Sequence, residues 1–403
     1  MKPSRGIKVA TIMNTLLIDL TPTMHKVRRA SLSAMLTSLI SGASLSVTWL
    51  GRNIDSRTTE KHQIKRSMRL CSNPHLHGEI MAIYSALALR VIGNQPQPII
   101  LVDWSDLDPR KQHFLLRASV AVEGRSLTIL ESVHTLAERD KPRIHKKFMT
   151  KLKQILPSSC CPIIVTDAGF RVPWFKLVTS LGWDYVGRVR NNTFCQNETD
   201  LDWHAVKDLY AKASTTPKSL GKYQMSRATP MHCQMVVYKQ KSKGRKDLVA
   251  TGDKARANSK SRSNAARENE PWLLATSLSA TSSQFAKKIV KIYRSRMQIE
   301  ESFRDLKTGL NFNKSNTRQQ KPLAVLLLLA LLGQYVLYLL GMAVTLTDQH
   351  RRYQANSLKT GHILSYQFIG LRAFKDRYLK LRRRDWQAAV DKIQQLMREP
   401  LNV

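Results

Sequence analysis

The sequence predicts an α/β protein in which a sheet of apolar strands follows a helical N-terminal domain and carries a β-rich insertion. Three observations support this fold class. Between residues 97 and 189, apolar β segments alternate first with short polar turns and then with helical segments. Residues 25–70 instead show helical periodicity. Residues 324–346 form an apolar stretch typical of a core helix in a large α/β domain.

The charge balance indicates an anionic polymer as the partner. The chain has 403 residues, enough for two or three domains with a substantial core. Its 65 Lys and Arg residues outnumber 29 acidic ones, and the resulting net charge of +36 makes the surface repel itself unless an anion neutralises it. A hydrophobic content of 42% and seven tryptophans favour a folded enzyme over a basic structural or ribosome-associated protein. We therefore expect nucleic acid as the partner.

The cysteines and the N-terminus indicate a cytoplasmic protein. The five cysteines are odd in number, lack C-x-x-C spacing and include the vicinal pair Cys160 and Cys161, which is a poor disulfide candidate. Asp19 interrupts the apolar stretch near the N-terminus, and no A-x-A cleavage site follows it. We expect reduced thiols and no signal peptide.

Residues 1–92 are predicted to form a helical, helix-turn-helix-like DNA-binding domain. Apolar-periodic segments between residues 25 and 70 are separated by a polar break at 55–58. The segment after the break carries side chains of the types that contact phosphates and guanine edges from a major-groove helix. These are Lys61, His62, Lys65, Arg66 and Arg69. The alternative is a basic helix that is merely solvated.

Residues 93–346 are predicted to form the catalytic domain. Three strand-like segments, QPIILVDWSD, FLLRASVAVEG and RSLTILESV, are joined by short turns and should form an antiparallel meander. A helix, the strand PIIVTDAGF, a short helix and the strand DYVGRVR follow. This βββαβαβ order is that of an RNase H-like core.

A β-rich basic insertion is predicted over about residues 191–270. Its clearest strand is HCQMVVYK, and a run rich in Ser, Lys and Arg follows from Lys239 to Arg267. With almost no apolar residues, this run should stay mobile until an anion binds it. An inert solvated loop is the alternative.

One long helix is predicted to run from a capping box at Thr281 and Gln284 to Lys307. At about 100° per residue, two adjacent stripes emerge, one apolar and one polar. The apolar stripe comprises Phe285, Ile289, Ile292, Ile299, Phe303 and Leu306. The polar stripe comprises Tyr293, Arg296, Glu300, Arg304 and Lys307. The polar stripe therefore borders the core, whereas Glu301 should face solvent.

The C-terminal third contains two further helical segments. Residues 324–346 are long enough to span a bilayer, but Gln334 lies near the centre and nothing else supports a tail anchor, so we expect a buried helix rather than a membrane span. Residues 347–403 form a C-terminal helical region whose segment RAFKDRYLKLRRRDWQAAVDKIQQLM is basic and amphipathic. Its apolar face could pack on the core or against another subunit, and dimerisation or DNA contacts are both open.

Three carboxylates are candidates for a catalytic metal site. Asp103 and Asp167 each end an apolar strand, where α/β proteins bind ligands, and Glu300 lies on the polar stripe. Three converging carboxylates could hold two Mg²⁺ ions about 4 Å apart, with Mn²⁺ as a substitute, and cleave phosphodiester bonds. Singly, each residue could equally be a cap or a solvated side chain.

The segment YRSRMQIEESFRDLK, residues 293–307, contains Tyr, Arg, Glu and Lys at the spacing Y-(2)-R-(3)-E-(6)-K. In this respect the chain resembles the DDE transposases of bacterial insertion-sequence family four. The resemblance extends through LVDWSD and VTDAGFRVPW to the helix-turn-helix-like region, so it covers most of the chain.

The resemblance implies specific residue roles. The metal ligands would be Asp103, Asp167 and Glu300. Tyr293, Arg296 and Lys307 would contact DNA phosphates near the cut. Trp272 would stack on a flipped-out base of the transposon end, although ordinary core packing is an alternative. Met297 stands where some relatives have an aromatic residue; it could still wedge into a base stack.

The resemblance also implies a reaction and its setting. The protein would bind terminal inverted repeats, cut through a hairpin intermediate and transfer the freed ends into target DNA in a cut-and-paste reaction. It would act as a homodimer in a paired-end complex, in the bacterial cytoplasm at the nucleoid. The alternatives are a DNA-binding regulator without cleavage activity and an RNase H-like nuclease or resolvase without strand transfer.

Overall fold

The computed structural model describes residues 9–108, 110–190, 193–199, 202–241, 270–355 and 364–398. The chain divides into two compact units. Of the described residues, the first unit contains those in 9–160 and 297–398, and the second contains those in 161–296. The boundaries predicted at residues 92 and 346 therefore do not coincide with the compact units, and they stay predictions about function.

The first unit begins with helices that the sequence marks with caps. These are α1 (Val9–Leu20), α2 (Lys26–Ile40), α3 (Val47–Arg52), α4 (Glu60–Cys71) and α5 (Pro74–Ile92). The Ser46 hydroxyl accepts a hydrogen bond from the Trp49 amide at the start of α3, and the Asn73 side chain accepts one from the Leu76 amide at the start of α5. The helical segments predicted between residues 25 and 70 are present.

A three-stranded antiparallel meander follows, in the order β3-β2-β1. It consists of β1 (Ile99–Asp106), β2 (His113–Ala121) and β3 (Ser126–Thr135), and α6 (Pro142–Ile155) comes next. Asp103 of β1 lies opposite Arg117 of β2, which in turn lies opposite Glu131 of β3. Three charged residues thus form one line across the meander, and directly opposed residues point to the same face.

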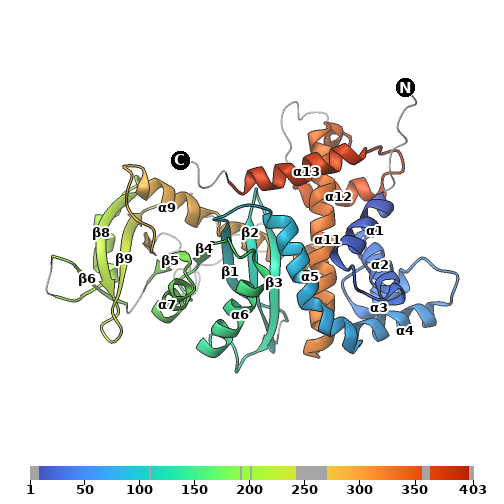
Figure 1. The fold of residues 1–403 in the computed structure, drawn as a ribbon, viewed down its shortest axis with the longest axis horizontal. Helices are drawn as coiled ribbons and strands as arrows, with labels where there is room; N and C mark the ends of the chain where they lie inside the picture. The colour runs from blue at the N-terminus through green and yellow to red at the C-terminus, as the bar shows by residue number, and fades with distance from the viewer. Residues whose placement is uncertain are drawn as a thin grey trace, which may run out of the picture. The chain divides into compact units, whose positions relative to one another are not determined.

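The long apolar helix α11 (Gln320–Leu346) forms the centre of the first unit. It contacts α2, β3, α12 (Tyr366–Lys375) and α13 (Arg383–Leu396) (Figure 1). Among the described residues, it alone is long and apolar enough to cross a membrane, but 94% of its most apolar window is buried within the protein. The prediction of a buried core helix is confirmed. The apolar face of α13, with Trp386 and Ile393 buried, also packs within this unit.

The second unit contributes seven strands, which lie side by side in the order β4-β5-β10-β9-β8-β6-β7. Its strands are β4 (Ile163–Thr166), β5 (Asp184–Val189), β6 (Phe194–Asn197), β7 (His204–Ala205), β8 (Lys218–Met225), β9 (Met231–Tyr238) and β10 (Trp272–Thr276). β4 and β5 are parallel, whereas β5, β10, β9 and β8 are antiparallel neighbours. Helices α7 (Val172–Ser180) and α9 (Phe285–Arg294) pack on the sheet, and a 3₁₀ segment spans Val206–Lys212.

The predicted order of elements over residues 97–189 is present as β1, β2, β3, α6, β4, α7 and β5. The β-rich character predicted after Arg190 corresponds to β6–β9. The basic run predicted from Lys239 to Arg267 lies largely outside the described residues.

The single long helix predicted from Thr281 to Lys307 is wrong. Helix α9 begins at Phe285, with no side-chain cap among the described residues, so the predicted capping box does not form. The chain then turns at Ser295, whose hydroxyl donates to the Ile292 carbonyl at 2.6 Å, a back-bond that bends helices. A second helix, α10 (Met297–Arg304), follows and passes into a π-helical turn at Asp305–Gly309. Both interruptions begin within the signature segment, residues 293–307.

Candidate functional site

Asp103 lies within β1 rather than at its end, because β1 continues to Asp106. The prediction that Asp103 ends the strand is therefore wrong by three residues. Its side chain is half-buried, and its Oδ1 accepts a hydrogen bond from the Trp104 amide at 2.8 Å. The carboxylate is thereby held in one orientation on the face of the sheet that also carries Arg117.

Glu300 lies in the first turn of α10, and α10 packs against β1, β2 and β3. Within the first unit, the structure thus brings the helix of Glu300 onto the meander that carries Asp103. Glu300 is exposed. An exposed carboxylate beside a sheet can reach a ligand that arrives from solvent.

The prediction that Glu301 faces solvent is wrong. Its side chain is only 32% exposed and pairs with Arg304 and, at 3.4 Å, with Arg125. Arg125 follows Gly124 in the turn between β2 and β3, and it also binds Asp305 at 2.6 Å. Glu301 therefore anchors α10 to the hairpin, whereas Glu300 points elsewhere on the helix.

Lys307 lies in the π-helical turn and is half-buried. Burial lowers the pKa of this ammonium, and Arg117 lowers it further, whereas Asp106 raises it. The signature lysine therefore lies near the end of β1. A cation in this position can pair with a phosphate at modest desolvation cost, because its own environment is already partly dry.

In the second unit, Asp167 follows β4 directly, as predicted. Its Oδ1 accepts a hydrogen bond from the Gly169 amide at 2.8 Å. The pKa of Tyr293 is raised by burial and by the charge of Asp167, whereas Arg296 and Arg188 lower it. The structure thus brings the signature Tyr and Arg into the electrostatic neighbourhood of Asp167. Tyrosine ordinarily keeps its proton at neutral pH, and the raised pKa of Tyr293 favours the protonated form further, so its hydroxyl can donate a hydrogen bond.

Trp272 lies on β10 within an aromatic cluster. Its ring contacts Tyr293 edge-on, with centroids 5.0 Å apart, and Tyr238 with centroids 5.6 Å apart. The indole is half-buried, so the cluster leaves part of it accessible. Trp272 therefore packs against other aromatic rings, and the accessible part of its ring leaves room for stacking on a base.

The sequence did not single out an arginine pocket near Asp167. A cavity of about 310 Å³ is lined by Arg171, Arg188 and Arg190 and by the apolar side chains Phe170 and Phe175. Arg188 and Arg190 both pair with Glu270, which also accepts a hydrogen bond from Tyr210 at 2.9 Å.

Two guanidinium groups share one carboxylate and Arg171 adds a third positive charge to the lining, which leaves an excess of positive charge that a phosphate would complement. Arg188 near the end of β5 and Arg190 just after it are two residues apart, a spacing that predicts one shared face in a strand, and this was the available signal.

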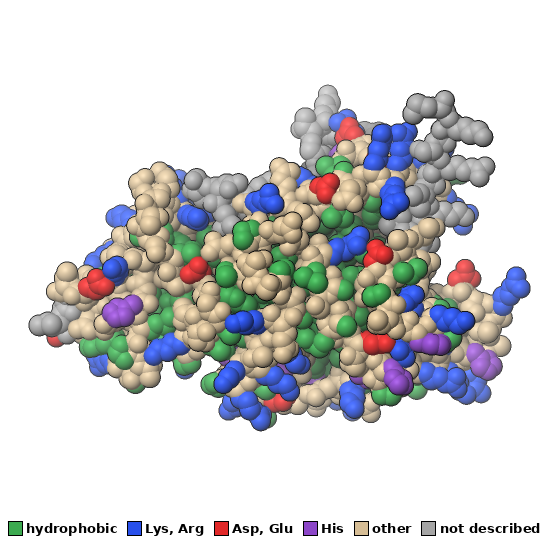
Figure 2. All heavy atoms as spheres, viewed as in Figure 1, with side chains coloured by type: hydrophobic (Ala, Val, Ile, Leu, Met, Phe, Trp, Pro, Cys, Tyr) green, Lys and Arg blue, Asp and Glu red, His purple; other side chains and the backbone are tan. Residues whose placement is uncertain are grey.

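A second basic concavity lies on the N-terminal helices. A groove of about 620 Å³ is lined by the predicted residues Lys65, Arg66 and Arg69. His25, Arg28 and His62 line it as well, and of these the sequence predicts only His62 as a DNA contact. Lys61 is exposed but does not line this groove. Figure 2 shows Lys, Arg and His side chains gathered around α4, which Figure 1 labels.

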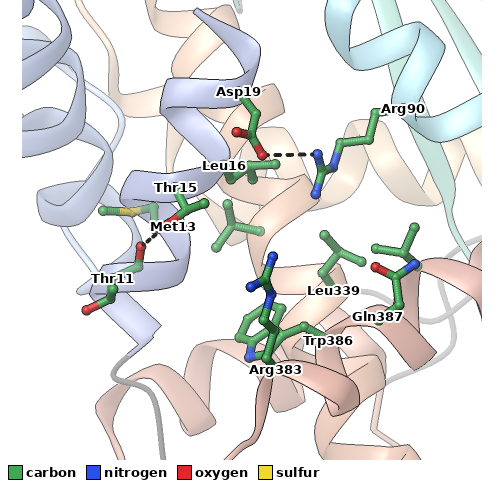
Figure 3. Close-up of a pocket in the computed structure, with 12 residues that line it drawn as sticks. Thr11, Met13, Thr15, Leu16, Asp19, Arg90, Leu339, Arg383, Trp386 and Gln387 are labelled. Atoms are coloured by element: carbon green, nitrogen blue, oxygen red, sulfur yellow. Dashed lines mark hydrogen bonds and ion pairs between the residues drawn. The ribbon is translucent and has the colours of Figure 1, made fainter. Parts of the chain in front are cut away.

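A third cavity, of about 340 Å³, has none of the predicted site residues in its lining (Figure 3). It lies between α1, α5, α11 and α13 and contains an ion pair between Asp19 and Arg90 at 3.4 Å. Its lining is mostly apolar and includes Trp386. This cavity therefore does not belong to the predicted site.

The donor chemistry of the predicted site suits a hard divalent cation. Asp103, Asp167 and Glu300 offer only carboxylate oxygens, which Mg²⁺ and Mn²⁺ prefer. In the part of the chain that the structure describes, no three His, Cys, Asp or Glu side chains are gathered closely enough to hold a metal ion. The assignment of these three residues as ligands stays a prediction.

Comparison with known proteins decides the family. The model of the transposase DDE domain matches residues 94–334, which is more than half of the chain. The chain belongs to the transposase DDE domain family. No curated protein matches it.

A cryo-EM structure of the piggyBac transposase synaptic complex with hairpin DNA is similar, with 12% sequence identity and a TM-score of 0.44. That match covers all of this chain and 85% of the other.

This DDE transposase is therefore an enzyme that acts on DNA, and DDE transposases use divalent metal ions. The matched region begins just before β1 and ends within α11. It contains Asp103, Asp167 and Glu300 as well as the whole signature segment.

Proposed function

We propose that this DDE transposase moves an insertion sequence by a cut-and-paste reaction. It binds the terminal inverted repeats, cleaves the DNA strands through a hairpin intermediate and joins the freed ends to target DNA. The observation that supports this most directly is the grouping of the signature residues Tyr293 and Arg296 with Asp167 in the second unit. The signature residues that share their spacing with family four transposases thus lie close enough to Asp167 to interact with its charge.

The proposed metal ligands are Asp103, Asp167 and Glu300, with Mg²⁺ as the ion and Mn²⁺ as a substitute. When bound, the metal pair supplies an activated oxygen nucleophile and stabilises the leaving oxygen. Two observations support the assignment: α10 packs on the meander that contains Asp103, and Asp167 stands at the carboxyl end of β4. The βββαβαβ order supports an RNase H-like core.

The remaining signature residues bind and orient DNA in this proposal. Tyr293 donates its hydroxyl proton in a hydrogen bond to a phosphate oxygen, and Arg296 and Lys307 pair with phosphates near the cut. Trp272 offers the accessible part of its ring to a flipped-out base. Met297, which is 50% exposed at the start of α10, wedges into the base stack. The arginine pocket beside Asp167 accommodates a further phosphate.

The N-terminal groove provides the contacts to the transposon ends. The groove residues Lys65, Arg66 and Arg69 neutralise DNA phosphates, and Lys61 contributes from the exposed side of α4. We propose that residues 1–92 act in this way as the DNA-binding region. Two copies of the protein then assemble on paired ends, in the bacterial cytoplasm at the nucleoid.

The C-terminal region, residues 347–403, carries a second basic surface. Nine basic side chains between residues 351 and 384 are all exposed: Arg351, Arg352, Arg372, Lys375, Arg377, Lys380, Arg382, Arg383 and Arg384. Tyr378, which is 81% exposed, lies among them. Because the apolar face of α13 is already covered within its own unit, the exposed side favours contacts with DNA over dimerisation.

The test uses purified protein and a DNA fragment that carries the inverted repeats flanking its gene. We expect cleavage at the repeat tips with Mg²⁺ and none with EDTA. Glu300→Gln should lower the cleavage rate by about 10³-fold or more, because one metal ligand contributes several kcal/mol at the transition state. The matched control is Glu301→Gln, which changes the adjacent carboxylate; its loss of activity should be far smaller than that of Glu300→Gln, because Asp305 still holds Arg125 against this segment.

The outcomes distinguish the alternatives. Cleavage by Glu300→Gln at the rate of the unsubstituted protein would contradict the ligand assignment. Specific binding to the repeats without any cutting would support a DNA-binding regulator. Cutting of branched or hybrid duplexes without strand transfer would support a nuclease or resolvase.

A further inference from the structure

Helix α10 is short and is interrupted at both ends. It has eight residues, preceded by the turn at Ser295 and Arg296 and followed by the π-helical turn. A short helix gains little stability from its own hydrogen bonds, so tertiary contacts must fix its position. The orientation of Glu300 therefore depends on the side chains that tie α10 to the meander.

Three side-chain anchors connect α10 with β2, β3 and the turn between them. Gln298 forms two hydrogen bonds with the backbone of Val122, at 2.9 and 3.2 Å. Arg125 binds Asp305 and Glu301. The third anchor is Arg117, which is buried and reaches from the middle of β2.

Arg117 is the most deeply buried of the three anchors, and its contacts lie inside the unit. Its Nε donates to Glu131 at 2.7 Å, and its Nη1 donates to the Ser302 hydroxyl at 3.0 Å. Its guanidinium carbon lies 4.6 Å from the ring centre of Phe303. One planar group thus holds β3 on one side and two consecutive residues of α10 on the other, just after Glu300.

The position of Arg117 in the sheet connects these contacts with Asp103. The two residues are direct partners in the β1–β2 register, so their side chains leave the same face at the same level. Asp103, Arg117 and Glu131 form the line of charged residues described above. Because Arg117 lies beside Asp103 in the sheet and binds Ser302, it fixes the position of α10 along the sheet relative to Asp103.

Stability alone does not explain a buried ion pair in this place. Arg117 and Glu131 are each only 1% exposed, burial raises the pKa of Glu131, and among the described residues none donates a hydrogen bond to Glu131 Oε2. A buried pair of this kind is often no more stabilising than apolar residues of similar volume. What apolar residues could not supply is the directional bond to Ser302.

We propose that Arg117 is a positioning residue for the cleavage reaction, which fixes α10 on the meander so that Glu300 is held in register with Asp103. This inference rests on the proposed metal-binding roles of Asp103 and Glu300. A lysine could not replace Arg117, because a single ammonium cannot bind Glu131 and Ser302 while also stacking on Phe303.

The experiment replaces the pair rather than one partner. Arg117→Met alone would leave Glu131 buried without its cation and could unfold the unit, so the informative variant is Arg117→Met with Glu131→Leu. Ser302→Ala removes only the bond between Arg117 and α10. Asp19→Asn with Arg90→Gln serves as a control ion-pair replacement among the helices of the same unit. Melting temperature, binding to the repeats and single-turnover cleavage across a Mg²⁺ titration are measured for each.

We expect the double variant to fold and to bind the repeats like the unsubstituted protein. Its cleavage rate should fall by about 100-fold, because a misplacement of about 1 Å has this effect, and its Mg²⁺ midpoint should rise by about 10-fold. Ser302→Ala should show the same pattern at about 10-fold in rate. The control pair should cleave at the unsubstituted rate.

The inference is overturned if the folded double variant cleaves within about 3-fold of the unsubstituted protein at the same Mg²⁺ midpoint. It is also overturned if the cleavage rates of the variants simply follow their melting temperatures, since that result indicates that the ion pair has a purely structural role. Failure of the proposed function itself would give a different result. In that case Glu300→Gln, measured in the same series, would cleave at the rate of the unsubstituted protein.

Discussion

Replacing Gly370 with alanine tests whether α11 is the packed centre of the unit that carries Asp103 and Glu300. Gly370 lies on α12, and a Cβ atom there would stand 2.0 Å from the Leu337 carbonyl oxygen of α11. Cβ atoms essentially never approach closer than 3.0 Å, so the two backbones would have to separate by about 1 Å (3.0 minus 2.0). Gly341 of α11 makes the reciprocal close approach to Tyr366 of α12. Both helices are therefore in backbone contact.

The cost of Gly370→Ala follows from this geometry. Overpacking of a core typically costs about 1–3 kcal/mol, and because the atoms that the new methyl group would meet are backbone atoms of Leu337 that cannot rotate away, we place this site at the upper end, about 3 kcal/mol. The better helix propensity of alanine offsets about 1 kcal/mol. The net loss of about 2 kcal/mol should lower the melting temperature of a unit of this size by about 5 °C.

Gly78→Ala on α5 is the matched control. The same substitution there meets no atom within 4 Å, so only the propensity gain remains. We expect stabilisation of up to about 1 kcal/mol, or a rise of about 2 °C. The two variants should shift the melting temperature in opposite directions, as measured by circular dichroism or calorimetry on the full chain. Equal melting temperatures for Gly370→Ala and the unsubstituted protein would refute the close packing of α11 on α12.

Two further predictions concern the DNA-contacting residues. Burial lowers the pKa of Lys307, so the folded protein binds this proton less tightly than the unfolded chain does, and the stability contributed by this group rises with pH between the folded and unfolded pKa values. Lys307→Met removes the buried charge; it should leave the melting temperature unchanged or higher while cleavage falls, and a parallel loss of stability and activity would contradict this. In the N-terminal groove, Lys65→Gln and Arg69→Gln should each reduce the slope of log affinity for the repeats against log salt concentration by about 0.9. The control, Lys153→Gln on α6, should leave specific binding to the repeats intact. Unchanged slopes for the groove variants would exclude the groove as a binding site for DNA phosphates.

Periodicity was sufficient to predict the buried face of the signature segment. Phe285, Ile289, Ile292, Ile299, Phe303 and Leu306 were placed on one stripe at about 100° per residue, and all six are buried. The prediction survives the turn at Ser295 because the turn occupies only two residues, so the helical phase is nearly retained. The order of elements from β1 to β5 could likewise be predicted, since each apolar segment has a length and a boundary of its own.

Contacts between distant parts of the chain could not be predicted in this way. The bond between Arg117 and Ser302 joins residues 185 positions apart, and the bond between Arg125 and Asp305 joins residues 180 positions apart. Local patterns contain no information about such pairs. For the same reason, the sequence suggested no partner for Arg188 and Arg190, which meet Glu270 across the β-rich insertion.

The two adjacent glutamates illustrate where a helical wheel stops being informative. A helical wheel predicts that residues on the side away from the core face solvent, and it predicted this for Glu301. In the structure, that side of α10 faces Arg125, which the turn between β2 and β3 brings within 3.4 Å of the Glu301 carboxylate. Glu300, on the other flank, remains exposed. The two glutamates therefore differ in what the structure gives them: Glu301 fixes the helix through Arg125, whereas the exposed Glu300 is the one that we propose as a metal ligand. A carboxylate neutralised by a structural guanidinium is a poor metal ligand, so the anchor has to be a separate residue.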